Sequence, residues 1–328
     1  MYNTTQGKLM KNFFHLITLT LLLPQSAFSD SLIGDRCNQC DLSGQEISGG
    51  SYNGYSMTYS DLQGAKFENV MFERSNFNNS DWSGVTIVKS EFQKCNFNVT
   101  DLSEAFIENV VFDKSEFSYA DLDETKFVNV SAIKAEFNNV SASEISLVSV
   151  DFTDANASVA VLDEAVIEDS KFDEIQFSYG DLSDSQISRT SFVDCECNNA
   201  NFSGAIFTDI EFTEANLNVA DFSKAVISQV VLADASMSYA DFSKSDVTDS
   251  NFNEVEANNA SFKKGRLIDV TFVDAGLRVA DFSGARLENV DFSGADLTYA
   301  NFDRAYLVNV NFEGADVGNV NFSNVVRE

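Results

Sequence analysis

The sequence predicts an all-β fold, an elongated solenoid built from short extended segments. Apolar residues recur at every fifth position from Leu42 to Phe322 without an insertion, and all 57 of these positions are apolar when Ala and Cys are counted. Of the 27 phenylalanines after residue 29, 26 occupy this series and only Phe106 does not. A period of five matches neither a helix nor an extended strand. It indicates a chain that turns a corner once per repeat.

A second period, of 20 residues, gives the number of sides in one coil. Phe recurs every 20 residues from Phe72 to Phe312, and the series is broken only at Ala132 and Leu232. Four five-residue sides therefore complete one coil, and stacked coils place like residues on like. The residue two before each apolar centre is usually small, which leaves room for large centres in a narrow core.

The first 29 residues read as a secretory signal peptide. Lys8 and Lys11 precede an apolar run over 13–23, and Ala27 and Ser29 supply the small residues of a cleavage site. The run is too short for a membrane span, and no later stretch approaches the roughly 20 apolar residues that a span needs. We expect cleavage after Ser29, a periplasmic or secreted protein and no membrane span. The alternative is a retained amphipathic anchor.

Composition excludes most enzyme classes. The only histidine, His15, lies in the signal segment, so the exported chain lacks an imidazole base, a His-ligated metal and a His-containing triad. No nucleophile elbow or Gly-rich phosphate loop is present. The formal charge is −30, which disfavours direct binding to nucleic acid. We therefore expect no enzyme activity, no cofactor and no metal.

Several repeats carry a recognisable motif. Ala120-Asp121-Leu122, Ala220-Asp221-Phe222 and Ala295-Asp296-Leu297 resemble the A(D/N)LXX motif of the pentapeptide-repeat family, and the resemblance runs from Cys40 to Val325. It implies a right-handed quadrilateral β-helix. With four repeats per coil, the 57 repeats make about 14 coils and a rod about 65–70 Å long. The domains expected are a signal peptide over 1–29, a leading segment over 30–39, the β-helix over 40–325 and a tail over 326–328.

The cysteines fall into two groups. Cys37 and Cys40 form a C-x₂-C just before the first repeat, and family members often begin with a similar Cys-x-x-Cys-Asp-Leu-Ser-Gly run. The resemblance and an oxidising compartment make a Cys37–Cys40 disulfide possible, and a reduced pair stays open. Two thiolates without histidine make a weak zinc site. Cys95, Cys195 and Cys197 occupy inward positions, where we expect them to act as small hydrophobes.

One exposed column, two residues after every fourth centre, repeats Tyr, Asn and Val with a period of 60 residues. Its tyrosines are Tyr59, Tyr119, Tyr179, Tyr239 and Tyr299. The period spans three coils, so it is consistent with growth by duplication of three-coil blocks. The functional alternative is a regularly spaced stripe, with tyrosines about 14 Å apart, that docks a repetitive partner.

Charge is divided into zones along two further columns. On the first, the acidic residues Glu104, Glu124, Glu144, Glu164 and Asp184 give way to the basic residues Lys224, Lys244, Lys264 and Arg304. On the second, Arg74, Lys94, Lys114 and Lys134 give way to seven acidic residues from Asp154 to Asp274. Stacked like charges repel, so stability does not explain them. They are either a solvated surface or a docking surface for a partner or an antiparallel second copy.

Asp61, Asp81, Asp101 and Asp121 form a further stack at the motif position. A short acidic side chain there accepts hydrogen bonds from nearby turn amides, so its expected role is structural. The alternative is a divalent cation held between neighbouring carboxylates, although no calcium-loop signature is present.

The function that the sequence favours is a non-catalytic, exported interaction or scaffold rod with an unidentified protein partner. The resemblance offers an alternative, because some cytosolic members of the family mimic DNA and bind type II topoisomerases. Export and the lack of the C-terminal dimerising helix of those members argue against it. We also expect a cover on the last coil near Phe322, supplied by a partner or a second copy, because a solenoid end exposes strand edges and apolar centres.

Overall fold

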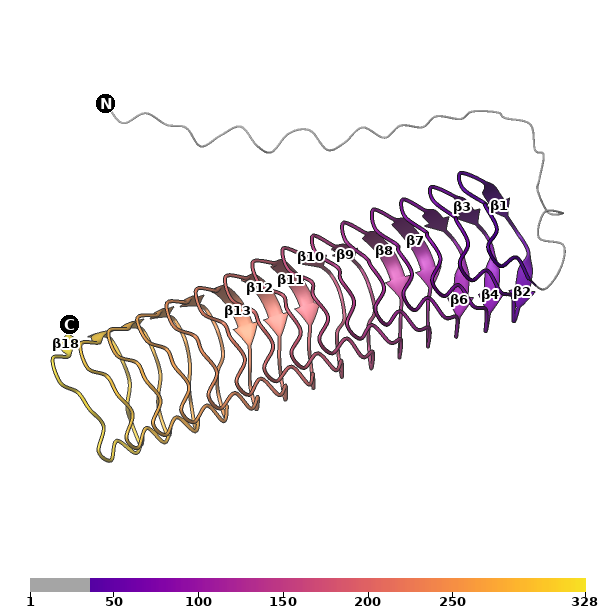
Figure 1. The fold of residues 1–328 in the computed structure, drawn as a ribbon. Coiled ribbons are helices and arrows are strands. Elements are labelled where there is room, and N and C mark those ends of the chain that lie inside the picture. The colour runs from indigo at the N-terminus through magenta and orange to yellow at the C-terminus, as the bar shows by residue number, and fades with distance from the viewer. Residues whose placement is uncertain (1–35) are drawn as a thin grey trace, which may run out of the picture.

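The computed structural model describes residues 36–328, which form one continuous rod of stacked coils (Figure 1). The predicted all-β solenoid of about 14 coils is confirmed. The predicted signal peptide over 1–29 lies outside the described residues. The eighteen strands of the described chain are β1 (Glu46–Ser48), β2 (Ser51–Asn53), β3 (Lys66–Glu68), β4 (Met71–Glu73), β5 (Thr86–Val88), β6 (Glu91–Gln93), β7 (Phe106–Val111), β8 (Lys126–Ser131), β9 (Ser146–Val148), β10 (Val166–Glu168), β11 (Gln186–Ser191), β12 (Ile206–Glu211), β13 (Val226–Val231), β14 (Asp246–Thr248), β15 (Arg266–Ile268), β16 (Arg286–Glu288), β17 (Tyr306–Val308) and β18 (Val326–Arg327).

Every pairing joins a residue to the one 20 positions later, in parallel register. In β12 and β13, for example, Phe207 pairs with Ile227. Sides of the coil that contain no named strand pair through isolated bridges, such as the bridge from Asp61 to Asp81. The backbone bonds therefore run between coils, along the length of the rod. This arrangement explains the lack of proline after residue 24, since each proline would remove one of these donors.

The chain turns at the residue two after each apolar centre. From Gly44 to Asn324 every one of these positions has a φ between +49° and +73°. We call the four columns of turning residues corner A (44, 64 and every twentieth residue to 324), corner B (49 to 309), corner C (54 to 314) and corner D (59 to 319). Because they follow one another around each coil, A lies opposite C and B lies opposite D.

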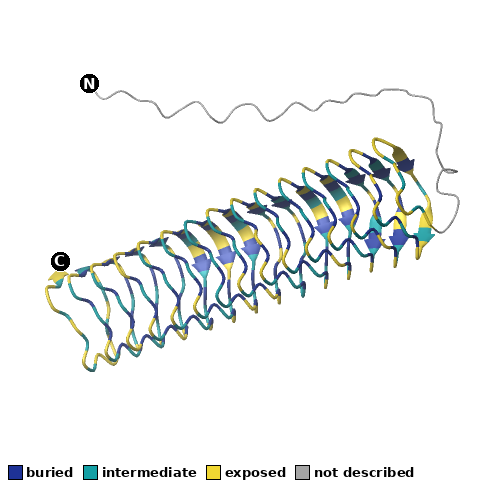
Figure 2. Ribbon diagram, viewed as in Figure 1, coloured by how far each residue is buried: buried dark blue, intermediate teal, exposed yellow. Residues whose placement is uncertain are grey.

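The core lies inside the rod, and the apolar centres and the small residues two before them are buried along most of its length (Figure 2). Aromatic rings at like positions stack from coil to coil. The centroids of Phe97 and Phe117 are 4.9 Å apart and those of Phe117 and Phe137 are 4.7 Å apart. Buried hydroxyls at the small positions donate to backbone carbonyl oxygens. Some of these belong to the preceding coil, as when Ser115 donates to Phe92 at 2.6 Å, and others to the same coil, as when Ser250 donates to Thr248 at 2.7 Å. The buried hydroxyls are thus paired, whereas the indole N–H of Trp82 has no hydrogen-bond partner among the described residues.

The ladder of rings is interrupted near the middle of the chain. The centres at Ala132, Ala142 and Ala157 are small, and an apolar cavity of about 30 Å³ lies among the residues around Ala142 and Ala157. Phe106, the phenylalanine outside the periodic series, is 37% exposed on β7. The five-residue period therefore separated buried from exposed phenylalanines correctly.

Both ends of the described chain join the ladder. Arg36 bridges to Ser56, and β18 pairs with β17 through Tyr306 and Val326. The paired backbone therefore extends beyond the boundaries expected at residues 40 and 325. At the last coil the guanidinium of Arg327 lies 5.2 Å from the ring centroid of Phe322 and covers part of it.

Candidate interaction surfaces

All the residues that the sequence singled out as interaction columns lie at corners. The tyrosines occupy corner D, the Glu-to-Lys series occupies corner A and the Lys-to-Asp series occupies corner C. Each of these residues therefore has left-handed backbone, which glycine adopts freely and other L-residues adopt at a cost. Sequence reasoning did not predict this. The available signal was glycine in two of these columns, for example Gly64 at corner A and Gly54 at corner C, and asparagine at corner D.

Corner D is the most apolar of the four corners. Its tyrosines and valines are between 48% and 65% exposed, and they follow one another with asparagine in the order Tyr, Asn, Val. The valines Val99, Val159, Val219 and Val279 have φ between +58° and +64°. A β-branched residue in this region is rare, because its Cβ substituents crowd the backbone. Corner D thus presents large apolar side chains at positions where they cost stability.

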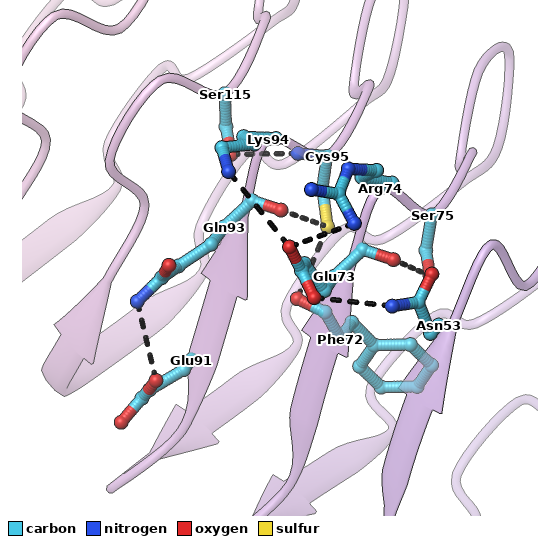
Figure 3. Close-up of polar contacts among 10 residues, drawn as sticks. All are labelled: Asn53, Phe72, Glu73, Arg74, Ser75, Glu91, Gln93, Lys94, Cys95 and Ser115. Carbon is cyan, nitrogen blue, oxygen red and sulfur yellow. Dashed lines mark hydrogen bonds and ion pairs between the residues drawn. The ribbon is translucent and has the colours of Figure 1, made fainter.

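The basic half of corner C is partly neutralised by its own chain (Figure 3). The Glu73 carboxylate forms ion pairs with Arg74 at 3.0 Å and with Lys94 at 3.8 Å. It also accepts a hydrogen bond from the Asn53 amide at 3.1 Å. Where the sign changes, the Lys134 ammonium lies 2.9 Å from the Asp154 carboxylate, and this hydrogen bond raises the pKa of Lys134. Corner C therefore has part of its charge paired within the chain, at Glu73 and at the change of sign.

Corner A differs from corner C in this respect. Its acidic and basic residues are exposed. Within residues 36–328, none of those from Glu104 to Lys264 forms an ion pair. Arg304 alone has a partner, Asp303, at 3.6 Å. At the point where the sign changes, Gly204 has no side chain, and the Asp184 carboxylate lies where its Cβ would be. Corner A thus carries two blocks of unpaired charge.

The aspartate stack has a structural role. The Oδ1 of Asp61, Asp81, Asp101 and Asp121 accepts a hydrogen bond of 2.9–3.0 Å from the amide two residues later. Burial raises the pKa of Asp121, and the neighbouring carboxylates of Asp123 and Asp101 add to this effect. No group of three or more potential metal ligands is present in the part of the chain that the structure describes. The cation hypothesis therefore receives no support from the geometry.

Comparison with protein families agrees with the five-residue repeat. The family description "Pentapeptide repeat region" matches residues 188–262 and 246–322, and "Pentapeptide repeats (8 copies)" matches residues 90–129. The chain belongs to the pentapeptide-repeat family. Proteins of this family are generally non-catalytic repeat proteins.

Several solved structures are similar to this pentapeptide-repeat chain. HetL, a pentapeptide repeat protein involved in heterocyst differentiation regulation in Nostoc sp. strain PCC 7120, is 19% identical over 71% of this chain and 90% of its own, with a TM-score of 0.30. Full-length QnrB1, a plasmid-mediated fluoroquinolone resistance protein, is 17% identical over 89% of this chain and 93% of its own, with a TM-score of 0.22. No curated protein matches.

The five cysteines of this pentapeptide-repeat protein form two disulfides and leave one buried free thiol. Cys37 and Cys40 form a disulfide with Cα atoms 5.5 Å apart, at the start of the described chain. Cys195 and Cys197 also form a disulfide, with Cα atoms 5.6 Å apart, inside the core. This second bond corrects the expectation that both are free thiols. Consecutive inward positions bring the two sulfurs together. Cys95 is free and buried, and burial raises its pKa to about 12.

The described part of this pentapeptide-repeat protein contains no helix of the length and apolarity that crossing a membrane requires. An open surface groove of about 550 Å³ crosses corner B, and its lining includes Lys171, Arg189, Asp169, Asp209 and Glu211. Arg189 donates from Nε to Asp169 at 2.6 Å, and this bond holds the pKa of the Asp169 carboxyl below its usual value. The charges in the groove are thus at least partly satisfied by one another.

Proposed function

We propose that this pentapeptide-repeat protein is an exported, non-catalytic interaction rod that binds a protein partner through corner D, with the charged columns directing the approach. The observation that carries the proposal is the unbroken Tyr, Asn, Val order of corner D, in left-handed backbone, over fourteen coils from Tyr59 to Asn319.

Duplication of three-coil blocks explains how the 60-residue period arose, but it does not explain why the period has survived at this corner. Corner A has the same history, yet its residues change from glutamate to lysine along the rod. The copies have therefore diverged at corner A and remained alike at corner D. Stability does not favour valine there, since glycine or asparagine adopts the same backbone at lower cost. Contact with a partner is the remaining reason for the retained order.

Exposed tyrosines suit such contact. They supply a large rigid ring with a polar end, and aromatic residues are enriched at binding surfaces. Three coils separate successive tyrosines, a spacing of about 14 Å. A partner that touches several of them gains from multivalency without needing a strong individual contact. The charges at corners A and C would steer the encounter and select its orientation.

Site-specific photocrosslinking in the native cell tests this function. A photoreactive phenylalanine analogue would replace Tyr119, Tyr179 or Tyr239 at corner D, or Asp209 or Asp249 at corner B, on the opposite side of the rod. We expect the three corner D positions to give an adduct of the same added mass, and the corner B positions to give none. Equal adducts from both corners, or none from any position, would contradict the proposal.

Export is tested by cell fractionation combined with the mass of the N-terminus. We expect the periplasmic or medium fraction to hold a chain that begins at Asp30. A cytosolic chain with an intact N-terminus would contradict export.

A second candidate function, binding to a type II topoisomerase as an acidic DNA mimic, is favoured by one feature. Corner C carries seven acidic residues on consecutive coils from Asp154 to Asp274. Such a line of carboxylates would attract a basic DNA-binding surface. This function requires a cytosolic location, so the fractionation experiment decides whether it is pursued. Inhibition of topoisomerase-catalysed DNA supercoiling by the purified chain would then be the direct test.

A further inference from the structure

Corner A has a charge pattern that is complementary to itself when reversed. Counted outward from Gly204, the first three coils on one side carry Asp184, Glu164 and Glu144, and the first three on the other side carry Lys224, Lys244 and Lys264. The fourth coil pairs Glu124 with Gly284, and the fifth pairs Glu104 with Arg304. No position in this series faces a like charge.

From this pattern we infer that the protein forms an antiparallel homodimer in which corner A of one rod lies along corner A of a second copy, with the two-fold axis at Gly204. In this arrangement the matched residues are Asp184 with Lys224, Glu164 with Lys244, Glu144 with Lys264 and Glu104 with Arg304. A two-fold interface is isologous, so each pair occurs twice. The inference goes beyond the proposed function, because it concerns corner A and not corner D.

The geometry of a solenoid makes this pairing possible. Two copies have the same spacing between coils, so a match at one coil is repeated at every other coil along the contact. Glycine at the axis has no side chain, which lets the two backbones approach at the centre. Next to the axis, the column that precedes corner A is small and uncharged, with Ser183, Ser203 and Ser223. A charged group does lie at the glycine, because the Asp184 carboxylate covers Gly204 within one chain, and in the dimer this carboxylate turns toward Lys224 of the second copy.

An exposed apolar patch lies beside the same axis. Ile206, two residues after Gly204, is 45% exposed, and Val226 in the next coil is also 45% exposed. An axis at Gly204 brings the two copies of Ile206 to the centre of the contact. The surface thus has apolar residues at its centre and opposite charges toward its ends, which is the arrangement of ordinary protein interfaces.

The register is determined by the same charges. Moving the axis by half a coil in either direction leaves three opposite-charge matches instead of four. Moving it by a whole coil places Asp184 opposite its own copy, or Lys224 opposite its own copy, and like charges in contact repel. Corner C could also pair with itself, but its central residues Lys134 and Asp154 are already bonded within one chain at 2.9 Å.

Charge reversal tests the inference. In the first variant Lys224, Lys244 and Lys264 become glutamate, so every charge at corner A is acidic apart from Arg304. In the second Glu144, Glu164 and Asp184 become lysine, so every charge is basic apart from Glu104 and Glu124. Sedimentation equilibrium at 50 mM salt should show a dimer for the natural chain and a monomer for each variant alone. An equimolar mixture of the two variants should form a one-to-one dimer. Higher salt should weaken both dimers, because exposed pairs are screened.

A control with the same change in charge separates this effect from net charge. Reversing Lys94, Lys114 and Lys134 to glutamate alters corner C, and we expect this variant to remain a dimer. Circular dichroism melting of every variant excludes misfolding as the cause of a monomer. A monomeric natural chain, dimers of either corner A variant alone, or a mixture that stays monomeric would each overturn the inference.

Cysteine crosslinking locates the axis. Gly204→Cys should give a disulfide-linked dimer on mild oxidation, whereas Gly84→Cys, at the same corner, should not, because its two copies would lie about 12 coils apart. Efficient crosslinking at Gly84→Cys and none at Gly204→Cys would overturn the placement of the axis. The same pair of variants excludes a dimer formed through the last coil.

Discussion

A corner residue other than glycine costs conformational free energy, because an L-residue with positive φ brings its Cβ close to the following carbonyl oxygen. The chain accepts this cost at most of its corners, with Asn, Asp, Lys, Glu, Tyr and Val among the residues used. Asparagine and aspartate tolerate the left-handed region best of these, and valine tolerates it poorly. Corners should therefore differ in stability according to the residue that they carry.

Exchanging valine and asparagine at corner D should show this difference. Val159 and Asn139 are one coil apart at the same corner, with φ of +61° and +58°. We expect Val159→Asn to stabilise the protein by about 1 kcal/mol and Asn139→Val to destabilise it by about the same amount. Urea denaturation measures both. Equal effects of the same sign would show that backbone conformation is not the cause.

Asp121 gives a dependence of stability on pH. Its folded-state pKa is raised, chiefly by burial, so the folded protein holds the proton more tightly than the unfolded chain does. The ionised carboxylate therefore destabilises the fold at neutral pH, and this penalty disappears as the pH falls below the pKa of the unfolded chain.

We expect Asp121→Asn to raise the melting temperature slightly at pH 7 and to have less effect at pH 3. The asparagine oxygen can still accept from the amide two residues later, as Asn201 does from Ser203 at 3.1 Å. Melting curves at the two pH values make the measurement. A gain of equal size at both would exclude ionisation of Asp121 as the cause.

At the scale of the single coil, the strength of the structure comes from rings stacked on rings. Phe117 lies between Phe97 and Phe137 and is fully buried, whereas Phe106 is partly exposed. Phe117→Ala should destabilise the protein by about 3–5 kcal/mol, because it removes a large side chain from a packed core. Phe106→Ala should cost less than about 1 kcal/mol. Urea denaturation of the two variants checks the difference, and similar losses from both would contradict the assignment of core and surface.

The sequence predicted which residues of each coil are buried, but it did not predict the disulfide in the core or the left-handed corners. The five-residue period identified the buried centres, since inward positions must be apolar whatever the backbone does. It could not reveal the Cys195–Cys197 disulfide, because a cysteine at an inward position reads equally well as a small hydrophobe. The left-handed corners were also missed. Tyrosine, lysine and valine give no signal of positive φ. The signals were the occasional glycine at corners A, B and C and the asparagines at corner D.

At the scale of the whole molecule, each coil contacts only its neighbours, so a solenoid tolerates the loss of entire coils. Deletion of residues 120–179 removes three coils and joins Tyr119 to Gly180 with every column still in phase. We expect this variant to fold and its longest dimension to shrink by about 14 Å, as measured by small-angle X-ray scattering. Deletion of residues 120–176 is the control. It puts the two parts of the chain out of the five-residue frame at the junction, so the coils on either side should no longer stack on each other and the melting temperature should fall. A control as stable as the in-phase variant would refute stacking of like on like as the principle of assembly.

The architecture of the whole rod followed from the sequence, and so did the exposure of the charged columns. What the period alone did not supply was the relation between columns: corners A and C face away from each other, and the charges of corner C are partly bonded within the chain whereas most of those of corner A are not. Side-chain reach decides such bonds. Glu73, which binds Arg74 and Lys94, belongs to neither charged column.

The direction of the backbone hydrogen bonds has a mechanical consequence. Because these bonds link coil to coil along the rod, tension applied at the two ends loads them one coil at a time and not all together. Both disulfides join residues within a single coil, so neither fastens one coil to the next. Under load the rod would unfold one coil at a time from an end. Each unfolded coil of 20 residues would add about 60 Å to the end-to-end distance.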